Sequence, residues 1–182
     1  MPFFAAQIWT GDEEKFLSLA RSGSLPASVQ LIWPRRSLRI RRKGVWRDSL
    51  APIFPSYVFI KTDVVDAGLY RKLKRTPGFV RFLQSNENIV PLDRKDQDLL
   101  VHFLEFGEVV DKSFAVFDRN KRIRIVSGPL KGLEGFIIKV DRRKGRAKVK
   151  LELYKNSFDV DFGFEVLEVA PDATPGAVPS EE

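Results

Sequence analysis

Hydrophobic and polar positions alternate with a period of two through the second half of the chain. Isoleucine alternates with arginine at residues 122–125, and aliphatic residues alternate with lysine and glutamate at 147–153. Successive side chains of a strand point to opposite faces, so this period predicts strands with one apolar and one charged face. A β-branched and aromatic run at 136–140 predicts a further strand between them.

Glycine-containing turns separate these runs. The segment SGPLKGLEG at 127–135 holds three glycines and a proline, which permit positive φ and would break a helix. The segment DRRKGR at 141–146 is expected to be a hairpin loop with an almost wholly basic tip. With an alternating closing strand expected at 157–168, the pattern predicts a small twisted β-barrel with a positive rim.

The first half of the chain alternates between strand and helix periods. Thr10 stands three residues before Glu13, which predicts a capping box at the start of a helix. Asp93 is expected to cap the last helix of this half. The order strand, helix, strand, strand, helix, strand predicts an α+β sandwich. The expected elements are strands at 3–9, 29–33, 50–61 and 79–82, and helices that follow Thr10, span 63–75 and span 93–106.

A dense basic segment follows the second expected strand and contains no acidic residue. Its alternation, with a turn at Lys43-Gly44, predicts a cationic hairpin. One interpretation is a solvated hairpin that only adds charge, and the other is an arm that contacts phosphates. The basic residues are Arg35, Arg36, Arg39, Arg41, Arg42, Lys43 and Arg47.

Composition adds a preference for an anionic partner. The 182 residues carry 31 basic and 24 acidic side chains, for a net charge of +7. Residues 119–150 hold twelve basic and two acidic side chains, whereas residues 151–182 hold one and eight. The positive field is therefore concentrated on the expected barrel.

Catalytic chemistry is not expected. The chain has no cysteine, and its one histidine, His102, lies in an apolar helical run without a second imidazole or a thiol to complete a metal or nucleophile set. We therefore expect no catalytic residue, no metal and no cofactor. No apolar run approaches the roughly 18 residues of a membrane span, so a cytoplasmic protein without membrane contact is expected.

Two motifs in the chain resemble those of one family. The stretch from Arg122 to Leu153 resembles a KOW motif, carried by Gly128, Pro129, Lys131, Gly132 and Gly135. The run FPSYVF at 54–59, followed by TPGFV at 76–80, resembles the N-terminal domain of the NusG family of transcription elongation factors. The order and spacing match from about Phe3 to Ala170.

The resemblance implies an organisation and partners. It implies an N-terminal antiparallel sheet flanked by helices at 1–107, a linker at 108–117 and an SH3-like KOW barrel at 118–170. Residues 171–182 are rich in Pro, Ala and acidic residues, a composition that predicts a disordered acidic tail. It also implies a monomer whose N-terminal domain binds the clamp helices of the large RNA polymerase subunit. The residues that it assigns to polymerase binding are Phe54, Tyr57, Ile8 and Trp9.

Two cationic groups are candidates for contact with a nascent RNA hairpin or non-template DNA. One is the barrel set Lys131, Lys139, Arg142, Arg143, Lys144 and Arg146. The other is the helical set Arg71, Lys72, Lys74 and Arg75, for which a solvated helix face is the alternative.

The sequence departs from the housekeeping pattern at one turn. Where housekeeping members have a Phe-Gly-Arg segment that contacts ribosomal protein S10 or Rho, this chain has Tyr154-Lys155-Asn156. That substitution and the basic barrel tip favour a specialised antiterminator of the LoaP type. A housekeeping factor that bridges polymerase to the ribosome or Rho, and a ribosome-associated KOW protein that binds RNA, remain alternatives.

Overall fold

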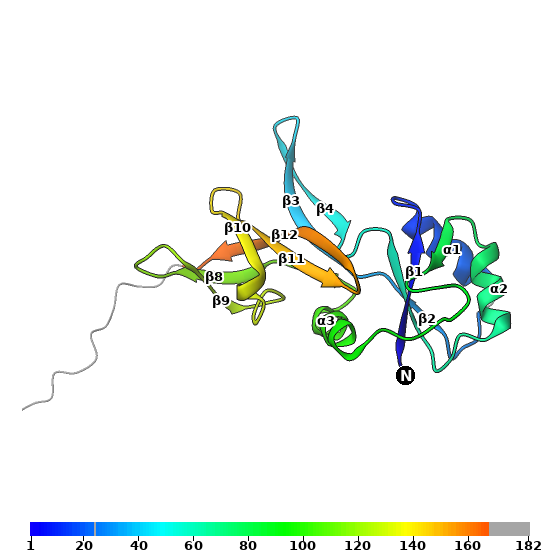
Figure 1. Ribbon diagram of the computed structural model, residues 1–182. Helices are drawn as coiled ribbons and strands as arrows, with labels where there is room; N and C mark the ends of the chain where they lie inside the picture. Colours follow the sequence, from blue (N-terminus) through cyan, green and yellow to red (C-terminus); the bar gives the residue numbers. More distant parts are fainter. Residues whose placement is uncertain (24, 168–182) are drawn as a thin grey trace, which may run out of the picture.

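The N-terminal part is built on a four-stranded antiparallel sheet (Figure 1). The computed structural model describes residues 1–23 and 25–167. The strand order is β2 (Gln30–Ile32), β5 (Tyr57–Lys61), β1 (Phe3–Ile8) and β6 (Phe79–Phe82). The long central pair β1 and β5 carries buried side chains on both faces, so both faces of the sheet must be covered.

Helices cover the two faces of this sheet differently. Helices α1 (Glu13–Ser22) and α2 (Ala67–Arg75) pack on the face that carries Phe4, Ala6 and Ile8 of β1. Helix α3 (Arg94–Leu104) lies on the opposite face, between the sheet and the C-terminal barrel (Figure 1). The alternation of β1 therefore divides the core into two clusters, and only the second cluster continues into the barrel.

The predicted cationic hairpin is confirmed. Strands β3 (Arg35–Arg42) and β4 (Val45–Pro52) pair antiparallel, and Lys43 and Gly44 both take positive φ, of 50° and 83°, at the turn. The short strand β7 (Val109–Val110) pairs parallel to the base of β3. The hairpin projects away from the body of the molecule (Figure 1).

The C-terminal part is a five-stranded barrel, which confirms the predicted α+β fold followed by a small all-β domain. Its strand order is β10, β11, β12, β8, β9. The segment 108–117, expected as a linker, contains β7 and the barrel strand β8. The barrel elements are β8 (Ser113–Phe117), β9 (Ile123–Ser127), the 3-10 turn η1 (Glu134–Phe136), β10 (Ile137–Asp141), β11 (Arg146–Leu153) and β12 (Asn156–Val166).

One predicted cap is confirmed and one is wrong. The Asp93 carboxylate accepts a hydrogen bond from the Asp96 N–H and caps α3. At α1, the Thr10 hydroxyl instead bonds the Ser56 hydroxyl, and the Glu13 carboxylate accepts from the N–H groups of Gly11 and Ser56. The tertiary contact with the loop before β5 has replaced the expected capping box. The expected acidic tail lies outside the described residues.

Candidate functional site

An aromatic cluster joins the N-terminal domain to the barrel. Phe54, in the loop before β5, packs edge to face against Phe158 of β12 with ring centroids 6.0 Å apart, and Tyr57 meets the same ring at 6.0 Å. Phe103 of α3 stacks on Phe162 of β12 at 5.4 Å, with an interplanar angle of 7°. Such aromatic pairs add about 0.5–1.5 kcal/mol each beyond the area that they bury. We call these five residues the aromatic seam.

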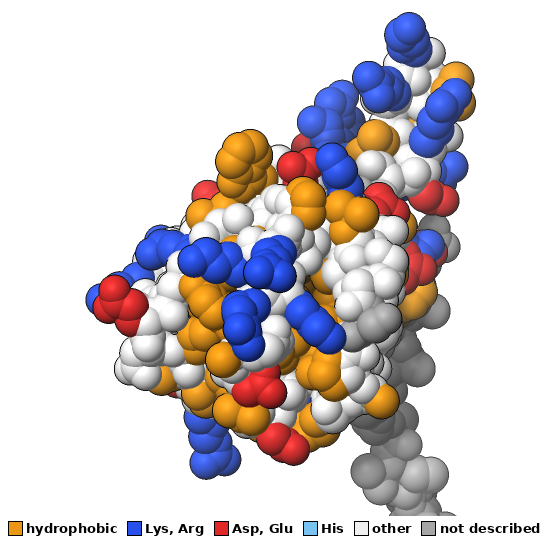
Figure 2. Space-filling view, turned by 90° about the vertical axis from the view of Figure 1, so that its right-hand side faces the viewer, with side chains coloured by type: hydrophobic (Ala, Val, Ile, Leu, Met, Phe, Trp, Pro, Cys, Tyr) orange, Lys and Arg blue, Asp and Glu red, His pale blue; other side chains and the backbone are white. Residues whose placement is uncertain are grey.

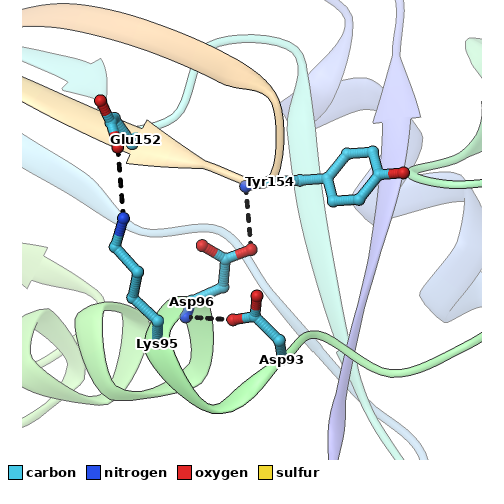
Figure 3. A network of polar contacts seen from close by, with 5 residues as sticks. All are labelled: Asp93, Lys95, Asp96, Glu152 and Tyr154. Carbon is cyan, nitrogen blue, oxygen red and sulfur yellow. Dashed lines mark hydrogen bonds and ion pairs between the residues drawn. The ribbon is translucent and has the colours of Figure 1, made fainter.

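Polar contacts surround the seam. The Asp96 carboxylate of α3 accepts a hydrogen bond of 2.8 Å from the Tyr154 N–H, and Lys95 pairs with Glu152 at 3.2 Å (Figure 3). Tyr154 has a φ of 56°, which turns its N–H toward the helix. Burial raises the pKa of Asp96, and the Tyr154 hydrogen bond opposes that shift.

Two further side chains connect the same surfaces. The amide of Asn156 donates to the Tyr57 hydroxyl at 3.0 Å, and burial raises the pKa of that hydroxyl, so it stays protonated at neutral pH. His102 of α3 contacts the Pro129 carbonyl at 2.8 Å, so its Nε2 must carry the proton. The lone histidine is thus an interdomain contact.

A partly buried arginine joins the hairpin to the barrel. Arg36 of β3 donates to the carbonyl of Asp161 in β12 and to that of Pro52 in β4, and its guanidinium lies 5.8 Å from the Phe162 ring. Burial lowers the pKa of Arg36 to about 10, with Asp161 opposing and Arg146 adding to the shift. The group therefore remains charged at neutral pH, compensated by carbonyl oxygens.

The residues predicted to bind polymerase are not all brought together. Phe54 and Tyr57 are 1% and 4% exposed and are covered by the barrel. Ile8 is buried in the other core cluster, against α1 and α2, whereas Trp9 is 66% exposed. Phe54 and Ile8 therefore belong to opposite faces of the sheet, and only the Phe54 side meets the barrel.

The predicted cationic residues fall into separate surfaces. Arg71, Lys72, Lys74 and Arg75 lie on the exposed face of α2, which is part of the face that Figure 2 presents to the viewer. Arg71 donates to the Ala67 carbonyl and Lys74 lies 5.6 Å from the Tyr70 ring. These contacts keep the two charges on the surface of α2. This helix belongs to the N-terminal domain, whereas the basic loop at 141–146 belongs to the barrel.

The barrel loop brings three of its six predicted cations, Arg143, Lys144 and Arg146, next to the β3–β4 hairpin. The Asp141 carboxylate accepts from the Lys144 N–H, which shapes the loop and lowers the pKa of Asp141, and Arg146 donates to the Arg39 carbonyl at 3.1 Å. Arg142 lies 4.3 Å from the Phe117 ring. Lys131 sits on the glycine loop, bonded to the Val126 carbonyl, and Lys139 is exposed on β10.

Sequence reasoning missed the interdomain contact itself. Phe158 was expected on the apolar face of the closing strand, but alternation alone does not tell which surface that face meets. Asp96, His102 and Asn156 carried no motif. The unusual turn at 154–156 was the one sequence signal near the contact.

Neither a membrane-crossing helix nor a metal site was found in the described part. Within residues 1–23 and 25–167, no helix is long and apolar enough to cross a membrane. The same residues contain no group of three or more side chains suited to hold a metal ion.

The fold defines a two-domain protein in which an α+β domain precedes a small barrel with a KOW-type glycine loop. A family model described as "Transcription termination factor nusG" matches residues 1–101, more than half of the chain. The chain therefore belongs to the NusG family of transcription termination/antitermination factors.

Individual relatives agree with this assignment. The transcription termination/antitermination protein NusG of Thermus thermophilus is 24% identical over 177 residues, covering 89% of this chain and 95% of the relative. The protein of the same description from Escherichia coli is 28% identical over 131 residues, 71% of each chain. A solved structure described as "Domain interaction in Thermotoga maritima NusG" has a TM-score of 0.57 and 19% identity, covering 89% of this chain and 93% of that one, and so shows the same fold.

Proposed function

We propose that this NusG-family protein binds RNA polymerase through the aromatic surface around Phe54 and Tyr57, and nucleic acid through the basic loop of its barrel. Two observations together support polymerase binding. The NusG family model matches residues 1–101, and the apolar surface around Phe54 and Tyr57 in this region is covered by the barrel. A helix of the polymerase clamp would replace Phe158 on that surface once the barrel leaves. The protein would act by stoichiometric binding, without bond chemistry.

The contact between the domains suits a reversible cover. Besides the aromatic seam, a buried apolar cluster continues across the contact, and Arg36 bonds the Asp161 carbonyl beside the Phe162 ring. The ion pair between Lys95 and Glu152 is exposed, with side chains 73% and 55% accessible. Exposed pairs contribute about 0–1 kcal/mol, so a competing partner has little electrostatic energy to overcome there. The seam then decides whether the barrel is docked.

Binding of purified core RNA polymerase to the full chain tests this proposal. Phe158→Ser removes the barrel ring that covers Phe54 and Tyr57 but leaves the N-terminal domain intact, so polymerase affinity should rise about tenfold, as expected for a loss of roughly 1–2 kcal/mol of docking. Ile138→Ser is the matched control, because Ile138 is a large apolar barrel residue on β10 that is 52% exposed and outside the seam.

Two outcomes would count against the proposal. Absence of polymerase binding by the wild type and by Phe158→Ser alike would exclude the polymerase part. Equal affinity gains for Phe158→Ser and Ile138→Ser would show that the seam does not cover the docking surface.

The second candidate function is a bridge to the ribosome. The turn at 154–156 stands where the resemblance places the ribosomal contact, and in this structure its Tyr154 N–H and Asn156 amide are engaged by the N-terminal domain. Co-purification of ribosomal protein S10 with Phe158→Ser, in which the turn is released, would favour this candidate over RNA targeting.

A further inference from the structure

Two adjoining clefts separate the β3–β4 hairpin from the barrel loop at 141–146. The larger, of about 770 Å³, extends toward the base of the hairpin, and the smaller, of about 480 Å³, lies toward its tip. Trp46, Lys144 and Arg146 line both, so the two form one continuous hollow, which we call the hairpin cleft. One wall comes from each domain, and the cleft therefore exists only while the barrel is docked.

The outer part of the hairpin cleft carries only positive charge. It is lined by Ile40, Arg41, Trp46, Arg143, Lys144 and Arg146, with four cations and no acidic residue. Arg146 also donates to the Arg39 carbonyl across the cleft and so fixes the spacing of the walls. Figure 2 shows Lys and Arg side chains on the projecting hairpin as well. Two cationic walls facing each other are suited to bind the phosphate backbone of a nucleic acid.

Trp46 supplies a surface for a nucleobase. Its side chain is 47% exposed although it is a large aromatic residue, and the Arg39 guanidinium lies 5.6 Å from its ring centroid. Exposed aromatic rings beside cations are the recurrent means by which proteins hold unpaired bases. A base in a duplex is stacked on both sides and cannot use this ring, which favours a single strand.

The inner part of the cleft favours ribose over deoxyribose. Asp48, Asp111 and Glu165 line it among the cations. Carboxylates repel phosphates but accept hydrogen bonds from hydroxyl groups, and the 2′-hydroxyl is the donor that distinguishes RNA from DNA. Glu165 is already paired with Lys112, which leaves Asp48 and Asp111 as the candidate acceptors.

We propose that the docked chain binds single-stranded RNA in the hairpin cleft, with Trp46 stacking on a base and Arg41, Arg143 and Lys144 on the phosphates. This inference rests on the nucleic-acid part of the proposed function and extends it from the barrel loop to a site shared by two domains. RNA bound in the cleft would stabilise the docked form, in which the polymerase surface is covered. By thermodynamic linkage, RNA then lowers the affinity for polymerase by a certain factor, and polymerase lowers the affinity for RNA by the same factor.

Fluorescence anisotropy of a labelled uridine oligonucleotide of about 12 bases, within the length range of single-strand sites, measures the binding to the full chain. Trp46→Ala should bind about 5- to 100-fold more weakly, and Trp46→Phe should recover most of that loss. Phe158→Ser, which weakens docking of the barrel and leaves every cleft residue in place, should weaken binding, by at most the roughly 5- to 30-fold that a docking loss of about 1–2 kcal/mol allows.

Salt titrations separate the cleft from general charge. Arg41→Ser and Arg143→Ser should each lower the slope of log affinity against log salt by about 0.7, the value for one phosphate contact on a single strand. Lys15→Ser removes one charge from the exposed face of α1, outside the cleft, and should leave the slope unchanged.

The outcomes distinguish this inference from the proposal on which it rests. If wild type does not bind the uridine oligonucleotide, the shared cleft is wrong, and binding of a hairpin RNA to the barrel then decides the nucleic-acid part of the proposed function. If wild type binds but Trp46→Ala or Phe158→Ser binds equally well, RNA binding stands and the shared cleft is wrong. Equal or tighter binding of the deoxy oligonucleotide, or of a duplex, overturns the assignment to single-stranded RNA.

Discussion

Two glycines of the KOW-type loop are required for different reasons. Gly128 has a φ of +97°, and a Cβ there would lie 2.7 Å from the Cα of Ser113 in β8, whose hydroxyl accepts from the Leu130 N–H. Gly132 has a φ of +83°, but nothing lies within 4 Å of the position of its Cβ. The first glycine is required by conformation and by close packing, the second by conformation alone.

Alanine substitution separates these two causes. Gly132→Ala should lower the free energy of unfolding by about 1–2 kcal/mol, the cost of a left-handed conformation for an L-residue. Gly128→Ala should cost clearly more, because backbone of β8 must move as well. Denaturant unfolding of the two variants measures the difference, and equal losses would show that the contact with Ser113 is unimportant.

At the scale of single elements, the helix α3 carries the connection between the domains. Its first turn presents Asp96 to the Tyr154 N–H, and its last turn presents His102 to the Pro129 carbonyl and stacks Phe103 on β12. Burial is the main cause of the raised pKa of Asp96, and the charges of Asp93 and Glu152 add to it, whereas the Tyr154 N–H and Lys95 oppose it. The docked helix therefore disfavours the charged form of Asp96.

This perturbation predicts a pH dependence. Because the pKa of Asp96 is raised in the folded protein, the folded state binds the proton more tightly than the unfolded state does. The stability that this group contributes is complete below the ordinary Asp pKa of about 3.9. It is lost as pH rises through the raised pKa of the folded state. The unfolding free energy of wild type minus that of Asp96→Asn should therefore increase as pH falls from 7 toward about 4.

The control for this measurement lies on the same helix. Asp98→Asn makes the same change in charge at a side chain that is 75% exposed, next to Arg94. Its difference from wild type should not show the rise. A difference between wild type and Asp96→Asn that stays constant over this pH range would contradict the assignment of Asp96 to a buried interdomain contact.

The elements show which structural features were predictable from the sequence. The period-two runs predicted the barrel strands, and the Lys43-Gly44 turn predicted the hairpin, because both signals are local. The capping box failed because Ser56, distant in sequence, offered Thr10 and Glu13 other partners. The aromatic seam was not predictable, since alternation places Phe158 on an apolar face without saying that Phe54 and Tyr57 complete it.

At the scale of the whole molecule, one contact governs two proposed activities. With the barrel docked, the surface around Phe54 is covered and the hairpin cleft is complete. With the barrel released, the proposed polymerase surface is open and the cleft is divided between two separate domains. In the proposed scheme, the domain arrangement selects between RNA held by the closed factor and polymerase held by the open one.

The absence of cysteine from the chain permits a direct measurement of this arrangement. Ser22→Cys at the end of α1 and Asn120→Cys in the loop between β8 and β9 place two exposed labels, one on each domain. Single-molecule energy transfer between the labels then reports whether the barrel stays docked. Saturating core RNA polymerase should shift the narrow distribution of the free protein to a second state, and Phe158→Ser should populate that state without polymerase. An unchanged distribution with polymerase bound would contradict the claim that the barrel covers the polymerase-binding surface.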